Sequence, residues 1–348
     1  MSVWASFEFD DHEQVCFFSN EKTGLRAIVA IHSTFLGPAA GGTRFKTYDG
    51  DSSALDDALR LSRAMSYKSA LAGMPVGGGK SVIIGDPARI KTRALLHAFG
   101  RFIDRIGNTY ATGEDVGMTV ADIDTVAEVT RFVGGTSGGA GDPSVHTAVG
   151  LLHGLRAVLE VQFRTDSFEG IRVAVQGLGA VGWRIAERLH AAGARLVVAD
   201  IRPDVVAKAV GTFGATSLPT QTIHSAEVDI YAPCALGGVL TEVSVGEIRA
   251  KAVAGAANNQ LATPRAGLML AERGILFAPD FVINAGGVIS GLEAASRMPG
   301  RAAAELAPLE VRLGAIHDRL AEIFRRSRAD GRPPEIAAEL MARQIIGR

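Results

Sequence analysis

Apolar positions recur along the chain with two spacings, and their alternation predicts strands and helices in turn. Residues 24–33 (GLRAIVAIHS) carry branched side chains between turn signals and predict a strand. Residues 52–73 and 91–107 carry apolar residues at helical spacing. Residues 80–87 (KSVIIGDP) predict a short buried strand, and the glycine-rich stretch 36–45 (LGPAAGGTRF) predicts a turn or bend. The first third of the chain therefore predicts a mixed α/β domain.

The stretch from Gly134 to Ser144 (GGTSGGAGDPS) predicts a domain linker, because it holds five glycines in eleven residues and no apolar anchor. Beyond it, the strand-like runs IRVAVQ, RLVVAD and VDIYAP alternate with short helical patterns. This alternation is typical of βαβ units in a parallel sheet. We expect a first domain over residues 1–134, a second over 135–315, and C-terminal helices over 316–348 that return to the first domain.

Composition narrows the class of protein. The 348 residues are 47% hydrophobic and 21% charged, which suits two globular domains. The formal charge is 36 − 37 = −1, which gives no electrostatic case for binding nucleic acid or an anionic membrane. No run approaches the roughly 20 apolar residues that span a bilayer. Two distant cysteines, Cys16 and Cys234, exclude a disulfide framework, and the acidic N-terminus lacks signal-peptide features. A cytoplasmic protein is expected.

A glycine pattern directly after a predicted strand indicates a dinucleotide site. Gly177, Gly179 and Gly182 form GxGxxG at the start of a predicted helix, and Asp200 ends the next strand, 18 residues beyond Gly182. The glycines allow a tight turn and close approach to a pyrophosphate, and the helix N-terminus favours its negative charge. Asp200 favours NAD over NADP, although Arg202 nearby keeps that choice open. The alternative is a βαβ unit whose glycines serve packing alone.

A second glycine stretch, GMPVGGGKS, ends in Lys80 and Ser81; its glycines predict a loop that is similar to a phosphate-binding P-loop. Aligned on Lys80, however, the first P-loop glycine falls at Met74, and a strand rather than a helix follows. We therefore expect the glycines to give a substrate close access to Lys80. A lysine becomes a useful base when burial or a neighbouring cation lowers its pKa. Lys68 is a candidate for that cation, and Asp115 lies in a loop, where a catalytic carboxylate is usual.

Nine motifs in order carry a family resemblance: LGPAAGGTR, MSYKSALAG, GGGKSVIIGDP, TGEDVGM, GGAGDPS, VQGLGAVG, YAPCALGG, AGAANNQLA and FAPDFVINAGG. Over residues 24–291, the chain resembles the leucine/phenylalanine/valine dehydrogenase branch of the glutamate dehydrogenase superfamily. The resemblance implies an N-terminal mixed-sheet substrate domain, a Rossmann-type doubly wound NAD domain, and a cleft between them. It also implies reversible NAD-dependent oxidative deamination of an L-amino acid to a 2-oxo acid and ammonia, by a homo-oligomer built from dimers.

The resemblance also implies roles for individual residues. Lys80 would be the general base that activates water, and Asp115 would carry protons to and from the amino nitrogen. Lys68 would bind the substrate carboxylate, Gly41 would leave room for the substrate, and Asn259 would hold the carboxylate or the nicotinamide ribose. The remaining residues expected along the cofactor are Thr147, Gly177, Gly179, Ala180, Val181, Gly182, Asp200, Cys234, Asn258 and Asn284.

Four small or mid-sized residues are expected to line the side-chain end of the substrate pocket: Ala40, Gly113, Val288 and Gly291. Several of these positions are larger in the leucine-type pattern, which predicts a roomier pocket here. L-Phenylalanine is therefore the expected substrate, with leucine or valine as the alternative. A pocket discriminates by only about 1–3 kcal/mol per methylene, so broad specificity is compatible with this expectation.

Three other functions stay open at this point. A dehydrogenase of 2-hydroxy acids would use a histidine proton carrier, and His146 is the nearest candidate. A non-catalytic NAD-binding regulator would not need Lys68, Lys80 and Asp115 together. A P-loop NTPase is disfavoured by the order of elements. No metal is expected, because the eight histidines show no HxxxH pair and the cysteines are isolated.

Overall fold

The computed structural model describes residues 2–138, 142–295 and 306–348, and it divides into two compact units. The first unit comprises residues 1–141, 290–306 and 342–348, and the second comprises 142–289 and 307–341. The domain limits expected from the sequence, after residues 134 and 315, differ from this division. Most of the C-terminal helical segment groups with the second unit, and only its last residues group with the first. Of the expected linker, residues 139–141 lie outside the described part.

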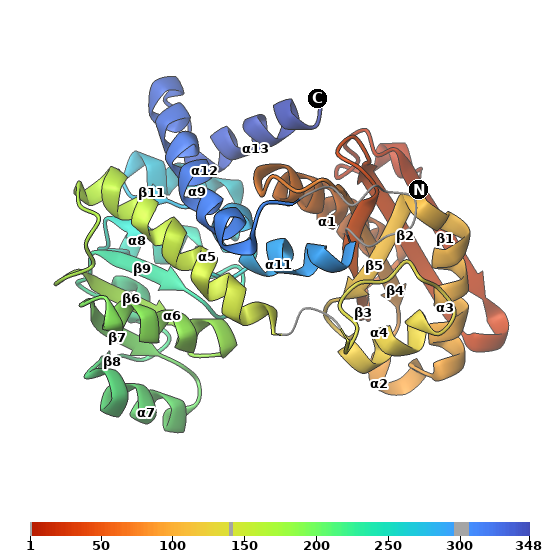
Figure 1. The fold of residues 1–348 in the computed structure, drawn as a ribbon, viewed down its shortest axis with the longest axis horizontal. Coiled ribbons are helices and arrows are strands. Elements are labelled where there is room, and N and C mark those ends of the chain that lie inside the picture. Colours follow the sequence, from red (N-terminus) through yellow and green to blue (C-terminus); the bar gives the residue numbers. More distant parts are fainter. Residues whose placement is uncertain (1, 139–141, 296–305) are drawn as a thin grey trace. The chain divides into compact units, whose positions relative to one another are not determined.

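A five-stranded mixed sheet forms the first unit, in the order β1-β2-β4-β3-β5 (Figure 1). Strands β1 and β2 pair antiparallel, as do β2 and β4, whereas β3 runs parallel to both β4 and β5. The elements of this unit are η1 Val3–Ala5, β1 Gln14–Asn20, η2 Glu21–Thr23, β2 Leu25–Ser33, β3 Ala39–Lys46, α1 Asp51–Leu71, β4 Gly77–Ile84, α2 Pro87–Ile90, α3 Arg93–Ile106, η3 Gly107–Thr109, β5 Tyr110–Glu114 and α4 Val120–Ala127.

Two glycine-rich stretches that predicted turns or loops are strands of this sheet. Residues 36–45 mostly form β3, and the three glycines before Lys80 begin the buried central strand β4. The predictions were wrong because glycine is a local signal for turns, whereas here it is required by close packing. A Cβ on Gly41 would lie 1.8 Å from the Gly79 carbonyl oxygen, and one on Gly78 would lie 2.0 Å from the Ser66 nitrogen of α1.

Two hydrophobic clusters cover opposite faces of this sheet. On one face, Val82 of β4 packs with α1 residues that include Leu55 and Leu59. On the other, Ile83 of β4 packs with α3 residues that include Phe99. Because side chains alternate along a strand, Lys80 lies on the same face as Val82 and points toward α1.

A six-stranded parallel sheet forms the second unit, in the order β11-β10-β9-β6-β7-β8. After β6, the strands β7 and β8 are added on one side of it, and β9, β10 and β11 are then added on the other side. The strand order therefore reverses between β6 and β9. The elements of this unit are α5 Pro143–Val158, η4 Leu159–Phe163, β6 Arg172–Gln176, α6 Ala180–Ala191, β7 Arg195–Ala199, α7 Pro203–Phe213, β8 Thr216–Ser217, η5 Ile223–Ser225, β9 Ile230–Pro233, α8 Glu242–Glu247, β10 Ala252–Val253, α9 Pro264–Glu272, β11 Leu276–Phe277, α10 Asp280–Ile283 and α12 Leu309–Asp330. The predicted two-domain α/β class, with a mixed sheet followed by a Rossmann-type sheet, is confirmed.

Helices α11 (Gly286–Ala295) and α13 (Pro334–Ile345) contain the points where the chain passes from one unit to the other. Helix α12 lies along α5 in Figure 1 and buries Ile316, Leu320 and Phe324. At the end of the chain, Arg343 pairs with Asp10 of the first unit at 2.8 Å. No helix in the described residues is both long enough and apolar enough to cross a membrane.

A buried carboxyl in α13 carries a prediction about stability. Glu335 is 9% exposed, packs against Gly267 of α9, and leaves its Oε2 without a hydrogen-bond partner among the described residues. Burial raises its pKa from 4.5 to about 7. A raised carboxyl pKa favours the folded state only while the group stays protonated, so its contribution to stability is lost as pH rises from the unfolded to the folded pKa.

Replacing Glu335 with glutamine is therefore expected to stabilise the protein above neutral pH, by up to about 3 kcal/mol at about pH 8. At about pH 4 the carboxyl is protonated in both states, and the two proteins are expected to differ little. Urea unfolding at both pH values measures the difference. An equal effect at the two pH values would contradict the assignment of this carboxyl as the titrating group.

Candidate active site

Two predicted catalytic residues meet in the first unit. Lys80 projects from β4 toward the α1 face, and Asp115 follows directly after β5. The Lys80 ammonium and one Asp115 carboxylate oxygen form a short ion pair. The lysine side chain is 8% exposed and the aspartate side chain 21%, so Asp115 is the more accessible member of the pair.

Burial sets the electrostatics of this pair. For Lys80, burial is the largest effect and lowers the pKa below 10.5, even though Asp115 opposes it. For Asp115, burial would raise the pKa, but Lys80 and then Arg44 outweigh it, so the pKa lies below its usual 3.8. Buried Lys80 can therefore lose its proton more easily than an exposed lysine, although the carboxylate beside it favours the ammonium form. This is the property required of a lysine base.

Arg44 is a cation that further lowers the pKa of Lys80, and sequence reasoning missed it. Arg44 lies on β3, and its Nε is 3.4 Å from the Asp115 carboxylate. Lys68, the cation expected in this role, lies half-buried on α1, the helix that covers the Lys80 face. The only sequence signal for Arg44 was its place at the end of the motif LGPAAGGTR.

Glycines of β3 and of the loop after β5 hold the Asp115 segment close to the sheet. A Cβ on Gly42 would lie 2.4 Å from the Glu114 carbonyl oxygen and 3.0 Å from the Asp115 Cβ. Gly117 has a φ of +81°, and its Cβ would lie 1.9 Å from the Phe45 carbonyl oxygen. Backbone packing at these glycines brings Asp115 to the lysine, and the expectation that glycines 77–79 give a substrate access to Lys80 stays a prediction.

The glycine loop of the second unit has the geometry of a phosphate site. Gly177 has a φ of +95°, and a Cβ on Gly182 would lie 1.8 Å from the Gly177 carbonyl oxygen. Gly179 precedes α6, whose first turn has no side-chain cap, and no described atom lies within 4 Å of the position of a Gly179 Cβ. Free N–H groups facing open space at a helix N-terminus suit a pyrophosphate, and Ala180 and Val181 form that first turn.

Asp200 stands at the end of β7, beside this loop. Its carboxylate accepts hydrogen bonds from the Leu178 N–H at 2.7 Å and from the Arg202 N–H and Nε at 3.0 and 3.1 Å. Burial would raise its pKa, but these hydrogen bonds outweigh burial and hold the pKa below 3.8. Asp200 therefore stays charged. Its hydrogen bond with Leu178 stabilises the glycine loop, in addition to any contact with a ribose.

Cys234 follows β9 on the other side of the reversal point. Its N–H donates to the Gln176 carbonyl at 2.7 Å, and its Cβ lies 3.4 Å from where a Gly182 Cβ would stand. Burial raises the pKa of the thiol to about 11, so the Cys234 side chain stays neutral and fills space in the packed interior. In doubly wound sheets, ligands bind outside the carboxyl ends of the strands at such a reversal, which fits the glycine loop and Cys234 together.

A third group in the second unit gathers predicted nicotinamide contacts. Asn284 is buried, and its Nδ2 donates to Asn258 Oδ1 at 2.9 Å and to the Ala256 carbonyl at 3.2 Å. Asn259 adopts a φ of +51°, and its N–H donates to the Asp280 carboxylate. A left-handed backbone in a non-glycine residue is uncommon and clusters at functional sites, and asparagine tolerates it best.

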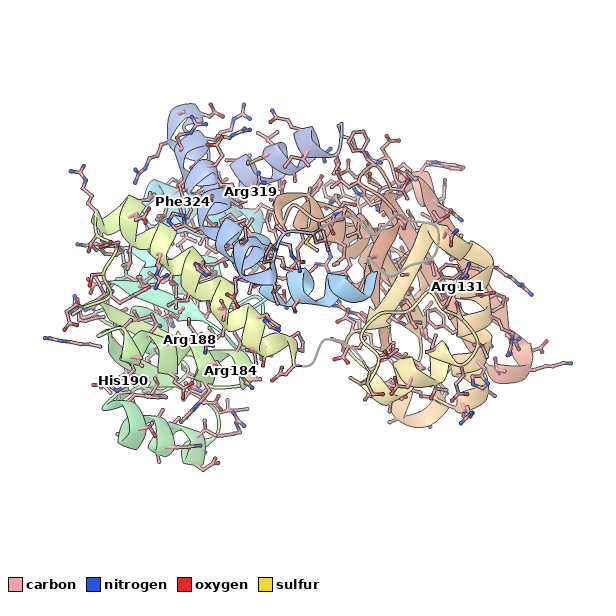
Figure 2. All side chains as sticks on the ribbon, viewed as in Figure 1. Arg131, Arg184, Arg188, His190, Arg319 and Phe324 are labelled. Atoms are coloured by element: carbon pink, nitrogen blue, oxygen red, sulfur yellow. The ribbon has the colours of Figure 1, made fainter. Side chains whose placement is uncertain are left out.

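Thr147 lies near the motif that contains Asn284. Its Oγ1 donates to the Pro143 carbonyl at 2.9 Å within α5 and lies 2.8 Å from the position of a Gly287 Cβ. At the start of α5, Asp142 accepts a hydrogen bond at 2.8 Å from Arg184 of α6, which Figure 2 labels. The structure thus links the first turn of α5 to the helix that follows the glycine loop.

The four expected pocket residues have different surroundings. Ala40 lies half-buried on β3, and Val288 half-buried on α11. Gly113 lies on β5, where a Cβ would be 3.1 Å from the Gly134 carbonyl oxygen. For Gly291, no described atom lies within 4 Å of a Cβ. The small size of Gly113 therefore serves tight packing and does not by itself indicate a roomy pocket.

Within the described residues, no three His, Cys, Asp or Glu side chains gather in a way that could hold a metal ion. Lys68, Lys80, Asp115, Ala40, Gly41, Gly113 and Gly291 belong to the first unit. Val288 and all the expected cofactor-binding residues belong to the second.

Comparison with known proteins adds independent evidence. Residues 12–132 match the model of the Glu/Leu/Phe/Val dehydrogenase dimerisation domain, and residues 138–209 and 202–326 match that of the Glutamate/Leucine/Phenylalanine/Valine dehydrogenase domain. The chain is 44% identical to leucine dehydrogenase of Geobacillus stearothermophilus over 349 residues, which cover 99% of this chain and 94% of the relative.

Two further similar proteins support the same family. Valine dehydrogenase of Streptomyces virginiae is 46% identical over 339 residues, covering 96% of this chain and 93% of the relative. The crystal structure of L-tryptophan dehydrogenase from Nostoc punctiforme superposes with a TM-score of 0.86 at 40% identity, covering 97% and 96% of the two chains. The family resemblance seen in the motifs is confirmed. This chain belongs to the Glu/Leu/Phe/Val dehydrogenase family.

Proposed function

We propose that this protein catalyses the reversible NAD-dependent oxidative deamination of a branched aliphatic L-amino acid, such as leucine or valine. The observation that carries the chemistry is the buried ion pair of Lys80 and Asp115, in which a lysine with a lowered pKa touches a carboxylate. Deamination requires a base that activates water and a group that carries the released proton to nitrogen, and this pair supplies both.

Each protein group has a defined task in this proposal. Lys68 binds the substrate carboxylate and fixes its orientation. The neutral Lys80 amine removes a proton from the water that attacks the imino carbon. The Lys80 ammonium formed in this step passes the proton through the Asp115 carboxylate to the amino nitrogen, so that ammonia can leave and the 2-oxo acid remains. In the reverse direction the same groups return the same protons.

When bound, NAD would supply the acceptor for the hydride of the substrate Cα–H. The residues of the second unit fit that cofactor: the glycine loop leaves space for the pyrophosphate, and the charged Asp200 repels a 2′-phosphate. Asn258, Asn284 and Thr147 are the residues proposed to hold the nicotinamide end, because their polar groups converge near the INAGG motif.

The branched aliphatic substrate class rests on two supports. Relatives that cover almost the whole chain are named leucine and valine dehydrogenases, and none of the three compared proteins is named for phenylalanine. In addition, a Cβ on Gly113 would make a tight contact of 3.1 Å with the Gly134 carbonyl oxygen, which weakens part of the argument for a roomy pocket. These supports favour the branched-chain alternative over phenylalanine.

Aromatic amino acids are the second candidate class, because the relative from Nostoc punctiforme is named for tryptophan. The test is a panel of L-leucine, L-valine, L-phenylalanine, L-tryptophan and L-glutamate, with NAD and NADP in turn, followed by the absorbance of the reduced cofactor. We expect the highest kcat/KM for leucine or valine with NAD. A higher value for an aromatic substrate would favour the second class, and no turnover with any amino acid would refute the proposal.

We also infer a homo-oligomer that associates through the first unit, because the family model matching residues 12–132 is described as a dimerisation domain. Light scattering of the purified protein tests this inference. A monomer at assay concentration would contradict it.

A further inference from the structure

Arg44 bridges two carboxylates at the centre of the first unit. Its Nη1 donates to both oxygens of Asp57 on α1, at 3.1 and 3.3 Å. Its Nε forms an ion pair with the Asp115 carboxylate at 3.4 Å; both atoms are buried, and Arg44 Nε makes no hydrogen bond within the described residues. The same oxygen of Asp115 meets the Lys80 ammonium. One guanidinium thus connects helix α1 to the reactive ion pair.

Arg44 itself is held from several directions. It lies on β3 opposite Val82 of β4, which places its side chain on the same face as Lys80. Asp57 is bound in addition by the Tyr48 hydroxyl at 2.9 Å and by Arg60 at 2.7 Å. Because Asp57 is held by three donors, it is a rigid anchor for Arg44. A planar guanidinium has five donors in a fixed fork, which lets one side chain reach two carboxylates.

We propose that Arg44 is a positioning residue of the deamination site: it holds the Asp115 carboxylate against Lys80 and places a permanent positive charge beside the pair. This inference rests on the proposed function, since it assigns Arg44 a part in the proton transfers of Lys80 and Asp115. Arg44 acts through Asp115 and is not itself a proton carrier, because a guanidinium keeps its proton throughout the working pH range.

The positive charge of Arg44 shifts the pKa values of Lys80 and Asp115 in the same direction. A positive charge favours the carboxylate form of Asp115 and disfavours the ammonium form of Lys80, so it lowers the pKa of both. Removing it raises both pKa values. Other charged or titratable groups on the elements packed here include Asp57, Arg60 and Lys68 on α1, Tyr48 after β3 and Glu114 on β5.

The test compares the wild-type protein with Arg44→Gln and Arg44→Lys. For Arg44→Gln we expect kcat for the best amino acid to fall by about 10²-fold, because the carboxylate is no longer held in place. In a plot of kcat against pH, the acid-side limb is the rise of kcat as Lys80 loses its proton. This limb is expected to move to higher pH in Arg44→Gln. The KM for the amino acid is expected to change less than kcat. A loss of activity with an unmoved limb would mean a merely structural brace and would overturn the proposal.

Arg44→Lys separates charge from reach. A lysine keeps the positive charge but cannot span Asp57 and Asp115 together, so the limb should stay near its wild-type position while kcat remains below wild type. Full recovery of kcat would overturn the positioning role. This variant also decides the question if Arg44→Gln does not fold. Arg26→Gln, which removes an exposed arginine paired with Asp51, is the matched control and should leave both kcat and the limb unchanged.

A second readout does not depend on activity. In protein labelled with ¹³C at the aspartate carboxyl carbons, with the Asp115 signal assigned through Asp115→Asn, the titration midpoint of Asp115 is expected at higher pH in Arg44→Gln than in wild type. An unchanged midpoint would overturn the proposal. If the wild-type protein deaminates no amino acid, the proposed function fails, whereas this titration still reports whether Arg44 sets the charge of Asp115.

Discussion

Replacing Lys80 with alanine is expected to lower kcat for amino-acid deamination by about 10³-fold, the scale of a lost general base. The lysine is buried, its pKa is lowered by that burial, and its only described ion-pair partner is Asp115. In the wild type, kcat should rise with pH as Lys80 loses its proton, at a pH below the ordinary lysine value of 10.5. That rise should disappear in the variant, which stopped-flow and steady-state profiles can measure.

Lys80→Arg separates the base from the charge. An arginine can keep the contact with Asp115, but it does not lose its proton, so it cannot activate water. We expect this variant to be nearly as inactive as the alanine variant. Lys22→Ala, which removes an exposed lysine from the short helix η2 of the same unit, is the control and should keep wild-type kcat. Substantial activity in Lys80→Arg would show that Lys80 is not the base.

Replacing Gly78 with alanine is expected to lower the free energy of unfolding by about 3 kcal/mol, the upper range for overpacking a core. Its Cβ would lie 2.0 Å from the Ser66 nitrogen and 2.3 Å from the Ser66 hydroxyl oxygen. Helix α1 cannot retreat freely, because that hydroxyl is bonded to buried His32 at 2.8 Å. Since α1 also carries Lys68 and Asp57, the shift should reduce activity as well.

Gly134→Ala is the matched control in the same unit, because no described atom lies within 4 Å of its Cβ. Its free energy of unfolding should stay within about 0.5 kcal/mol of wild type, as for most surface substitutions. Urea unfolding of the two variants measures the difference. Equal stability of Gly78→Ala and wild type would mean that the contact between β4 and α1 is looser than these distances indicate.

Local patterns predicted the second unit well, because its signals are short and contiguous. The branched residues of β6, the glycines that follow and Asp200 at the end of β7 lie within one βαβ unit. Each of these residues is constrained by neighbours close in sequence, such as the Leu178 N–H that binds Asp200. Sequence spacing alone is therefore enough to place them.

Long-range packing limited the prediction of the first unit. Glycines 77–79 predicted a loop, yet they form the start of β4, because a Cβ at each would collide with distant segments: the Ser33 carbonyl, Ser66 and the Tyr110 ring. A glycine chosen for such a contact leaves the same local signal as a glycine chosen for a turn. Only the three-dimensional structure separates the two.

By itself, then, the sequence determined the α/β class, the glycine loop with Asp200, and Lys80 and Asp115 as candidates, because motifs and strand periodicity are local. The tertiary structure decided that Lys80 and Asp115 touch, that burial lowers the pKa of Lys80, and that Arg44 supplies a positive charge acting on both. The physical reason is that charge coupling depends on distance and burial, and β3, β4, β5 and α1 acquire these only when the sheet of the first unit is assembled.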